Sequence, residues 1–424
     1  MAKVAFLSLI FPPDSVSTAQ IMGELAVELK KLGHELIVLT TTPHYNRDVE
    51  AESKQPLYPY WGKLLRKSTF NGISVYHIIM PKKSKYLGAR FIPFLYFHIF
   101  SCIAGMVVFK KPDVMIVPSP PITLGVCAWI LSQFQRAKFI YNVQEIYPDC
   151  AINLGAIRNR LIIRLLYKLE AFVYSRAAAV TVIAPNMAQC LSEKGIPSHK
   201  IRVIPNFVDI NDMCPLPRDN EFSRQYNVHN KFVVSYAGNI GPAQDMETFI
   251  KCAHILKNRQ DIHFMMIGDG MLRDRLKEKA ERLKLHNVAF IPYQPYSLVP
   301  QIYAASDLCL VPQLSEITSS AIPSKVYRIM ACGRPVLAAT KSQSDLAQLV
   351  ANARCGFVVK SGSAESYAEA IIKAFKRQDL LCSMRKAGRD YVVENYTREA
   401  ISKLYHDLII SLTNSTKANR VHVQ

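Results

Sequence analysis

Three short segments in the second half of the chain combine glycine turns with a lysine. Gly238–Gly241 and Gly268–Gly270 each follow a short apolar run, and Ser324 and Lys325 stand where a helical pattern begins. Glycine allows a backbone to approach a ligand closely, and backbone amides with an ammonium can hold a diphosphate without a metal ion. Each segment alone is a common turn, but their order and spacing together predict a site for a phosphorylated ligand.

Two carboxylates follow an apolar run in the first half of the chain. Glu145 and Asp149 come directly after the run that begins near residue 138. Ligands of open α/β sheets bind outside the carboxyl ends of the strands, so either side chain could orient a sugar hydroxyl or accept its proton. Asp149 could equally cap a helix or form a salt bridge.

A third candidate is the loop after the first apolar run, where Ser17 and Thr18 precede or open a helix. Backbone amides and the helix dipole at such a turn attract phosphate. The loop lacks the glycines of a dinucleotide-binding turn, and both residues could simply cap the helix. The two interpretations are left open.

The elements that must position these residues are short apolar runs alternating with helical stretches, which is typical of parallel α/β layers. We expect an α/β fold of two Rossmann-like domains: 1–210, a linker over 211–230, and 231–393. A helix over 394–413 should cross back to the first domain, and 414–424 should be a loose tail. The runs predict strands near residues 4–10, 35–41, 73–79, 113–119, 138–145, 178–184, 201–206, 231–238, 263–268, 288–292, 307–312, 334–339 and 356–359.

Composition and charge narrow the possible partners. Half of the 424 residues are apolar and a fifth are charged, which excludes a disordered chain. The 52 Lys and Arg exceed the 33 Asp and Glu by 19, so we expect phosphorylated small molecules or an anionic membrane surface as partners. No nucleic-acid-binding motif accompanies this charge, so nucleic acid is not expected. The ten cysteines have no zinc-site or redox spacing and suggest a reducing compartment.

Two segments carry a membrane signal. Residues 91–109 contain no charge and are flanked by Lys82, Lys83, Lys85, Arg90 and Lys110. Their length suits a membrane span, but a parallel sheet needs a crossover helix at this point, and we favour a helix packed on the sheet. Residues 158–177 interleave basic and apolar side chains, as an interfacial anchor or an ordinary half-buried helix would. The N-terminus does not resemble a targeting signal, so we expect a cytoplasmic protein at the inner face of the plasma membrane.

Further short motifs occur in a recognisable order along the chain. They are Pro12-Pro13 with Thr18-Ala19, Gly33-His34-Glu35, Ser119-Pro120-Pro121, Tyr147-Pro148-Asp149, Val203 to Asn206 with Asp209, Gly238 to Gly241 with Gln244, Gly268 to Gly270, and residues 323–336. Together they resemble a retaining family-4 glycosyltransferase with the GT-B fold, over nearly the whole chain. Within that family the chain is similar to the O-antigen and colanic-acid branch that contains L-fucosamine transferase-like enzymes.

The resemblance implies a donor and an acceptor. A nucleotide sugar, expected to be UDP-linked, would be held mainly by the C-terminal domain. A lipid-linked saccharide, such as one on undecaprenyl diphosphate, would be held mainly by the N-terminal domain. The implied transfer retains the anomeric configuration, and we expect no metal and no cofactor. The product would belong to a bacterial surface polysaccharide such as an O-antigen or capsule.

Roles follow residue by residue from the matched positions. Lys325 would stabilise the departing diphosphate, and Glu145 would position the acceptor hydroxyl. Substrate binding is expected to involve Ser17, Thr18, Asp149, Gly238, Asn239, Gly241, Gln244, Gly268, Gly270, Tyr293, Ser324 and Arg328.

The chain departs from the family pattern at several of these positions. Many members carry two glutamates before the Ala-Cys-Gly segment, where this chain has Ser320 and Arg328, with Glu316 as a possible substitute for the first. The Arg and Lys that commonly contact the donor diphosphate are Asn239 and Gln244 here. A histidine that many relatives carry corresponds to Gln144. Lys325 is the best candidate to replace the lost positive charge.

Two other classes of function remain open. A non-catalytic, membrane-associated partner with the same fold would explain the missing glutamates, and a nucleotide-sugar epimerase would share the two-domain shape. A nicotinamide-dependent oxidoreductase is disfavoured because neither glycine turn matches the required fingerprint. Measured transfer of a sugar to an acceptor would distinguish a glycosyltransferase from all of these alternatives.

Overall fold

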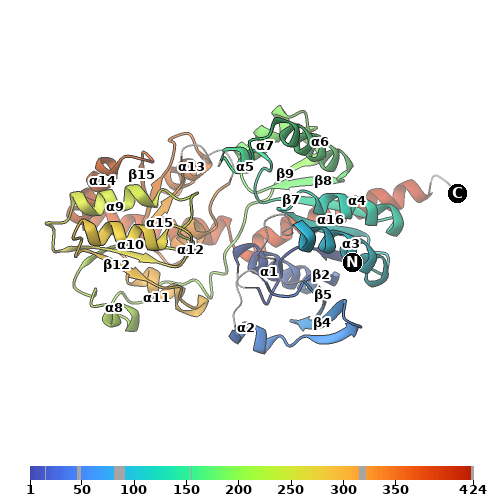
Figure 1. The fold of residues 1–424 in the computed structure, drawn as a ribbon, viewed down its shortest axis with the longest axis horizontal. Helices are drawn as coiled ribbons and strands as arrows, with labels where there is room; N and C mark the ends of the chain where they lie inside the picture. The colour runs from blue at the N-terminus through green and yellow to red at the C-terminus, as the bar shows by residue number, and fades with distance from the viewer. Residues whose placement is uncertain (15, 45–48, 81–90, 154, 315–320, 422–424) are drawn as a thin grey trace. The chain divides into compact units, whose positions relative to one another are not determined.

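The computed structural model describes residues 1–14, 16–44, 49–80, 91–153, 155–314 and 321–421 (Figure 1). The chain divides into two compact units. The N-terminal unit comprises Met1–Ile152, Ile157–Asn206 and Arg398–Gln424, and the C-terminal unit comprises Asn153–Ala156 and Phe207–Thr397.

The N-terminal unit is built on a nine-stranded sheet of order β3-β4-β5-β2-β1-β6-β7-β8-β9. The strands from β5 to β9 are parallel, and all parallel strands fall where the apolar runs predicted them. The inner strands are buried on both faces, which explains their continuous apolar sequence. The strands are β1 (Lys3–Leu7), β2 (Glu35–Thr41), β3 (Tyr58–Trp61), β4 (Leu65–Phe70), β5 (Ile73–Ile78), β6 (Val114–Ser119), β7 (Lys138–Val143), β8 (Ala179–Val182) and β9 (Ile201–Val203).

Two strands that the sequence analysis did not predict, β3 and β4, add an antiparallel edge to the parallel sheet. These strands pair antiparallel with each other and with β5. Asn71 and Gly72 join β4 to β5 with φ of 48° and 73°, the backbone that a two-residue hairpin turn requires. The Asn-Gly pair was thus a readable hairpin signal that our sequence analysis did not use.

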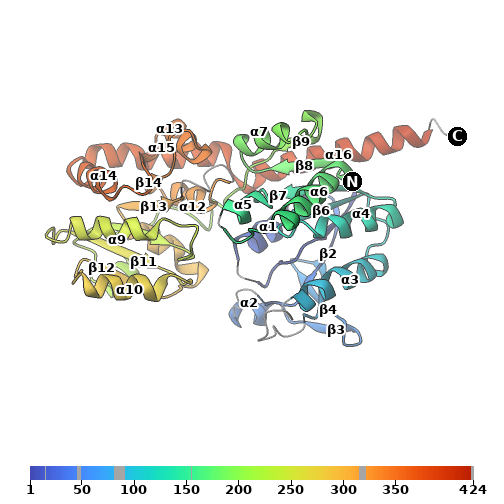
Figure 2. The same ribbon diagram turned by 45° about the horizontal axis from the view of Figure 1, so that its top comes forward.

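Helices cover both faces of this sheet. α1 packs against α16, while α3 packs against β2, β5 and α4 as the crossover between β5 and β6 (Figures 1 and 2). Within the described residues, no helix is both long and apolar enough to cross a membrane. The helices of this unit are α1 (Ser17–Lys31), α2 (Val49–Lys54), α3 (Phe91–Val108), α4 (Leu124–Gln135), α5 (Asp149–Asn153), α6 (Arg160–Arg176), α7 (Pro185–Glu193), the 3₁₀ turn η2 (Ser198–Lys200) and α16 (Arg398–Val421).

The C-terminal unit contains a six-stranded sheet of order β12-β11-β10-β13-β14-β15, parallel throughout. α9 and α14 pack together over its apolar core (Figure 1). The elements are α8 (Glu221–Gln225), β10 (Phe232–Ala237), α9 (Met246–Ile255), β11 (Ile262–Ile267), α10 (Arg273–Arg282), β12 (Val288–Ile291), η3 (Tyr296–Leu298), α11 (Val299–Ala304), β13 (Leu308–Pro312), α12 (Lys325–Ala331), β14 (Val336–Ala339), α13 (Asp345–Asn352), β15 (Gly356–Val359), α14 (Ala364–Lys376) and α15 (Gln378–Asn395).

The segment 211–230, which we expected to be a linker, packs as part of the C-terminal unit. Arg218 forms an ion pair of 2.8 Å with the buried Asp307, and Asn220 caps α8 with a reciprocal capping box. The sequence predicted a linker between the domains here, but Arg218 and Asn220 make specific contacts within the unit.

The last helix belongs to the N-terminal unit. Arg398 lies 3.0 Å from the carboxylate of Glu28 on α1, and Lys138 donates to the carbonyl of Leu412 at 2.9 Å. α16 continues to Val421, through most of the residues expected to form a loose tail.

Candidate functional site

Two loops of the C-terminal unit lie together at the carboxyl edge of its sheet. Gly238 follows β10 and Gly268 follows β11, and these neighbouring strands end level because Ala237 pairs with Ile267. The loops are joined backbone to backbone, since the amide of Ile240 donates to the carbonyl of Asp269 at 2.8 Å. The structure therefore brings the two predicted glycine turns into one surface.

Two of the glycines are required by close packing within this surface. A Cβ at Gly268 (φ 133°) would lie 2.0 Å from the carbonyl oxygen of Gly238, so the loops could not meet. A Cβ at Gly238 would lie 2.7 Å from the Nζ atom of Lys325. Gly268 thus serves the contact between loops, and Gly238 leaves the space that the lysine ammonium occupies.

Lys325 opens α12 and points its ammonium at these loops. Its Nζ atom lies 3.9 Å from the centroid of the Tyr236 ring, a cation–π contact. Burial, and secondarily the positive charge of Arg328, lowers the pKa of Lys325 to about 7, although part of the side chain is still accessible. No acidic side chain of the described residues forms an ion pair with it. A crowded ammonium without a carboxylate partner suits an anionic ligand.

The other predicted residues of this unit share the same edge. Arg328 lies one turn along α12, 5.1 Å from the centroid of the Tyr296 ring. The Tyr236 hydroxyl donates to the carbonyl of Asn239, and the Gly241 amide donates to Gln244 Oε1 at 3.1 Å. The side chains of Gln244 and Tyr236 therefore stabilise the loop after β10 through hydrogen bonds to its backbone.

The remaining predicted residues of this unit lie near the same edge and have fewer specific contacts. Tyr293 follows β12 and is half exposed, and Gly270 packs against the carbonyl of Ile240. Ser324 precedes α12 in a helical conformation and makes no side-chain cap bond. α12 is only seven residues long, so the lysine and arginine side chains, rather than the helix dipole, supply its positive charge. Glu316 and Ser320 lie outside the described residues.

In the N-terminal unit, Glu145 also lies at a carboxyl edge, two residues after β7 ends. Its side chain is accessible to solvent, yet burial by the surrounding protein raises the pKa of its carboxyl group, with an opposing hydrogen bond from Cys150. An accessible carboxylate in this position can accept a hydrogen bond from a sugar hydroxyl.

Asp149 has a different environment. Tyr167 on α6 donates to its Oδ1 atom at 2.9 Å, and Lys194 contacts its Oδ2 atom. The same ammonium binds the buried Glu170 at 2.7 Å. The Asp149 carboxylate thus links α5, α6 and the end of α7, which corresponds to the salt-bridge alternative that the sequence left open.

Ser17 and Thr18 are not the cap of α1. The N-cap position is Val16, which makes no side-chain cap bond, and Ser17 is the first helical residue. The helix therefore begins one residue before the predicted start, and the capping alternative is wrong for both residues. They are half-buried near the carboxyl end of β1.

The structure also assembles groups that sequence reasoning missed. The buried Asp14, in the loop after β1, accepts from the amide of His44, which follows β2. His44 is also bonded to Thr41 Oγ1 at 3.0 Å. Both residues follow neighbouring strands, so the rule about carboxyl ends could have found the pair.

A second missed set surrounds Gln144. Its amide donates to Asn142 at 2.7 Å and accepts from Asn206 at 2.9 Å, and Asn142 in turn donates to Tyr405 of α16 at 2.7 Å. Gln144 is buried and fixed in this network. It therefore holds the end of β7 in place, directly before Glu145.

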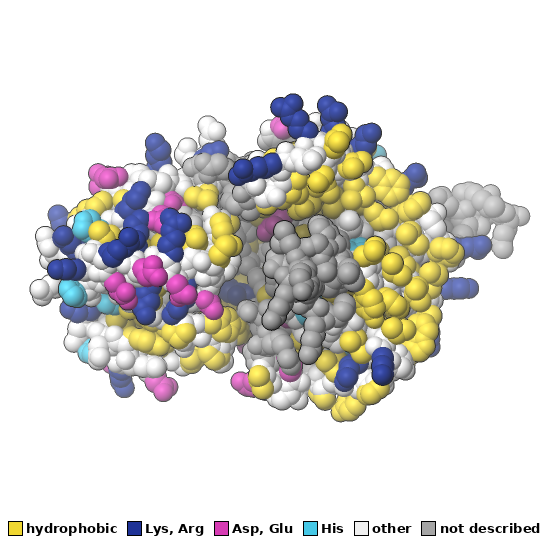
Figure 3. Space-filling model, in the orientation of Figure 1, with side chains coloured by type: hydrophobic (Ala, Val, Ile, Leu, Met, Phe, Trp, Pro, Cys, Tyr) yellow, Lys and Arg dark blue, Asp and Glu magenta, His cyan; other side chains and the backbone are white. Residues whose placement is uncertain are grey.

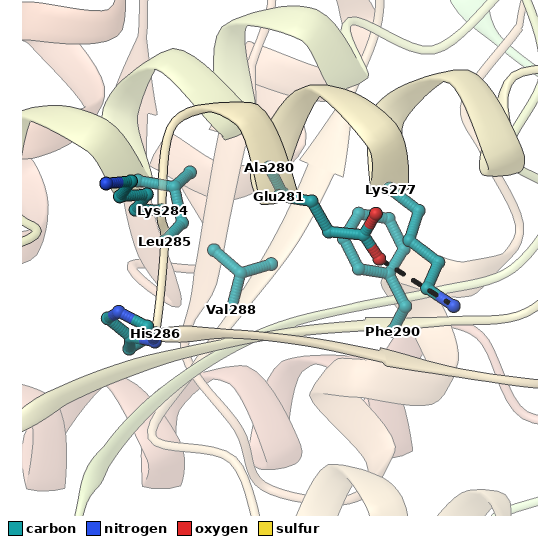
Figure 4. A pocket seen from close by; sticks show the side chains of 8 residues that line it. All are labelled: Lys277, Ala280, Glu281, Lys284, Leu285, His286, Val288 and Phe290. Carbon is teal, nitrogen blue, oxygen red and sulfur yellow. Dashed lines mark ion pairs between the residues drawn. The ribbon is translucent and has the colours of Figure 1, made fainter.

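A separate hollow of 380 Å³ lies between α10 and the start of β12 (Figure 4). Lys277 and Glu281 form an ion pair of 4.0 Å on its α10 side, and His286 lies near the amino end of β12. This is the opposite edge of the sheet from the glycine loops, so the hollow is not part of the site. Across the described ranges, no three His, Cys, Asp or Glu side chains gather as a metal site.

Comparison with known families matches both units. Residues 18–206 match the "Glycosyl transferase 4-like domain", and residues 218–391 match "Glycosyl transferases group 1". The second match contains the glycine loops, Lys325 and Arg328, and the first contains Glu145.

Individual relatives are distant. The chain is 24% identical to WcaI of Escherichia coli K12, named as a colanic acid biosynthesis glycosyl transferase, over 82% of this chain and 85% of that protein. It is 24% identical to the E. coli UDP-Gal:alpha-D-GlcNAc-diphosphoundecaprenol alpha-1,3-galactosyltransferase over 52% of this chain and 58% of that protein. The crystal structure of Anabaena HepE in complex with UDP-glucose superposes with a TM-score of 0.73 at 16% identity, covering 97% of this chain and all of that one. This last likeness shows a shared fold.

Proposed function

This chain is a family-4 glycosyltransferase of group 1 with the GT-B fold, and from that premise we propose that it builds a bacterial surface polysaccharide. It transfers a sugar from a nucleotide sugar, UDP-linked, to a saccharide carried on a lipid diphosphate. The two relatives named above support the product class and the acceptor, because one is named for colanic acid and the other for a diphosphoundecaprenol substrate.

The observation that carries this proposal is the environment of Lys325. Its ammonium is crowded by Tyr236 and Gly238 and has no acidic partner among the residues the structure describes. The donor diphosphate supplies the missing negative charge, and Arg328 adds a second positive charge on the same helix. Charge developing on the leaving diphosphate is then stabilised without a metal ion.

The reaction exchanges one bond at the anomeric carbon for another. The bond from that carbon to the diphosphate oxygen breaks, and the acceptor oxygen bonds to the same carbon from the same face, which retains the configuration. The acceptor proton leaves with the diphosphate. Glu145 accepts a hydrogen bond from the acceptor hydroxyl and positions it, while Lys325 and Arg328 hold the diphosphate.

A lipid-linked acceptor requires a protein that works at a membrane. The excess of positive charge favours an anionic surface, and we place the protein at the inner face of the plasma membrane, peripherally bound. There the acceptor and the nucleotide sugar are both available.

The first test is thermal unfolding with UDP, GDP and NAD in turn, all at the same saturating concentration. At about 100 times its dissociation constant, a ligand that binds only the folded state adds about 2.7 kcal/mol, and we expect the shift with UDP alone. Transfer is then measured with UDP-glucose, UDP-galactose and UDP-N-acetyl-L-fucosamine, the last because of the resemblance noted in the sequence.

The variant Lys325→Ala should lower the transfer rate by roughly ten- to a thousandfold. Lys251→Ala, at an exposed lysine on α9, is the control and should leave it unchanged. A UDP shift with no transfer to any lipid-linked saccharide would favour the non-catalytic partner, and a shift with NAD alone would overturn the proposal.

A further inference from the structure

The solvent side of α3 is apolar along its described length. Its exposed side chains are Leu95, Ile99, Ile103, Met106 and Val107, with exposed fractions between 38% and 62%. Their spacing places them on one stripe of the helix. The opposite side is also apolar, since Phe97, Ala104 and Val108 are buried. A helix at an ordinary protein surface would carry polar side chains on its outer stripe.

The stripe continues onto two neighbouring helices. α3 packs against α4, and α4 packs against α6. Gln135 at the end of α4 donates to the carbonyl of Met106 at 3.1 Å, which places the exposed Phe134 beside the end of the stripe. Trp129 of α4 stacks edge-on against Phe172 of α6 at 5.0 Å. The outer sides of α3, α4 and α6 therefore form one surface, here called the apolar face.

α6 adds two strongly exposed leucines and a set of positive charges. Leu161 and Leu165 are 69% and 65% exposed. Arg160, Arg164 and Lys168 are exposed on the same helix, and its only acidic residue, Glu170, is buried against Lys194. Figure 3 shows hydrophobic side chains over the part of the N-terminal unit where Figure 1 places these helices, with Lys and Arg at the margins. This combination is typical of a surface that enters the headgroup region of an anionic bilayer.

The apolar face is tied to the candidate acceptor side of the unit. α6 follows β7, so its first two turns, with Leu161 and Leu165, are near the carboxyl edge that carries Glu145. Tyr167 of α6 is bonded to Asp149, four residues after Glu145. A membrane held on α6 would therefore lie next to the residue that receives the acceptor.

We propose that the apolar face docks the protein on an anionic bilayer. The exposed side chains of α3, with Phe134, Leu161 and Leu165, lie at the boundary of headgroups and acyl chains. The basic side chains of α6 contact lipid phosphates: Arg160, Arg164 and Lys168. The inference rests on the proposed function only for the reason that a lipid-linked acceptor lies in that bilayer. A second copy of this chain fits the face less well, because a two-fold contact would bring the basic margin of α6 against its own copy.

The test measures binding of the full chain to vesicles of phosphatidylcholine, with and without 30% phosphatidylglycerol. We expect binding to the anionic vesicles only. Ile99→Asp should weaken it about tenfold, since it replaces a half-exposed apolar side chain with a charge. Ile255→Asp is the matched control, because Ile255 is 47% exposed and Ile99 is 49% exposed, but Ile255 lies on α9 of the other unit. The control should bind as wild type does.

Charge is tested separately. Arg160→Glu with Arg164→Glu removes two basic groups, each contributing about fivefold near an anionic surface, so binding should fall about 30-fold or more. Lys251→Glu with Lys257→Glu makes the same change of charge at two exposed lysines, one on α9 and one directly after it, and should have a much smaller effect. Equal losses in both pairs would mean that net charge alone drives binding, and the assigned face would be wrong.

Two readouts keep this proposal distinct from the proposed function. All four variants should keep the UDP-induced thermal shift, because their substitutions lie outside the donor loops. If the wild type shifts with UDP but does not bind anionic vesicles, the docking face alone is overturned. If it binds these vesicles but does not shift with UDP, the proposed UDP-linked donor alone is overturned. A dimer in sedimentation that dissociates on Ile99→Asp, without vesicle binding, would assign the face to a second copy.

Discussion

Lys325 should make the binding of a nucleotide sugar depend on pH near neutrality. Its ammonium is crowded against the Tyr236 ring and beside Arg328, and its pKa is about 7. A bound diphosphate favours the charged form, so the complex holds the proton more tightly than the free protein does. Binding is therefore coupled to proton uptake, and affinity falls as the pH rises through the pKa of the free protein.

The size of the effect follows from that value. With a pKa of about 7, about nine tenths of the free molecules carry a charged Lys325 at pH 6 and about one tenth at pH 8. If the charged form alone binds, the dissociation constant rises about tenfold between these two values. Lys325→Met keeps the length of the side chain without its charge, and it should bind weakly with no pH dependence over this range.

Calorimetry with UDP-glucose at pH 6, 7 and 8, in two buffers of different ionisation enthalpy, measures both the affinity and the proton uptake. A nucleotide sugar is preferable to UDP, because UDP has a terminal phosphate that itself titrates in this range. Lys251→Met is the control. Equal affinity of the wild type at pH 6 and pH 8, or full affinity of Lys325→Met at pH 6, would refute the reasoning.

The same group also predicts how the unliganded protein responds to pH. The pKa of Lys325 is lower in the folded state, about 7, than its ordinary value of 10.5, so between these values the unfolded chain binds more protons. The free energy of unfolding therefore gains up to about 1.4 kcal/mol per pH unit from this group as the pH rises through that window. Below pH 7 the folded protein carries the full cost of the crowded charge. Urea unfolding of Lys325→Met at pH 6.5 and pH 9 should show this slope removed.

Two further substitutions separate structural from functional roles. Gly268→Ala should lower the free energy of unfolding by about 3 kcal/mol in urea titration, because its Cβ would lie 2.0 Å from the Gly238 carbonyl oxygen. The control is Gly362→Ala. Gly362 also has a positive φ (84°), but its Cβ would have no atom within 4 Å, so this change should cost only about 1 kcal/mol. Asp149→Asn should lower the free energy of unfolding by about 1 kcal/mol because it weakens the contact with Lys194, while the transfer rate per folded molecule should stay within a few fold of wild type. A loss of transfer above a hundredfold at unchanged stability would mean that Asp149 acts in substrate binding or catalysis.

Most of the fold could be predicted because its strands are buried on both faces. Such strands read as continuous apolar runs, and those at 114–119 and 232–237 lie within two residues of the predicted bounds. β3 could not be found this way. All four of its residues are exposed at the edge of the sheet, so no inward-facing apolar residues mark it. It pairs with β4 through the turn at residues 62–64, where the Leu64 amide donates to the carbonyl of Trp61 at 3.0 Å.

The position of the candidate site's residues at sheet edges was predictable from the sequence, but their contacts were not. The rule about carboxyl ends placed Glu145 and the glycine loops correctly at sheet edges. The partners of the candidate residues come from distant parts of the chain: Lys194 forms an ion pair with Asp149, and the ammonium of Lys325 lies over the ring of Tyr236. No local pattern specifies such pairs, because they depend on how the helices pack on the sheet.

The departures from the family pattern form one consistent set when the contacts are considered together. The loop after β10 has Asn239 and Gln244 where the resemblance implied Arg and Lys, and here the Asn239 carbonyl and the Gln244 side chain are bonded within the loop. The positive charge comes instead from Lys325 on α12, and it fits only because residue 238 has no side chain. Restoring an Arg at position 239 would place a second cation beside an ammonium whose pKa is already about 7. The uncharged loop and the crowded lysine are therefore complementary in space and in charge.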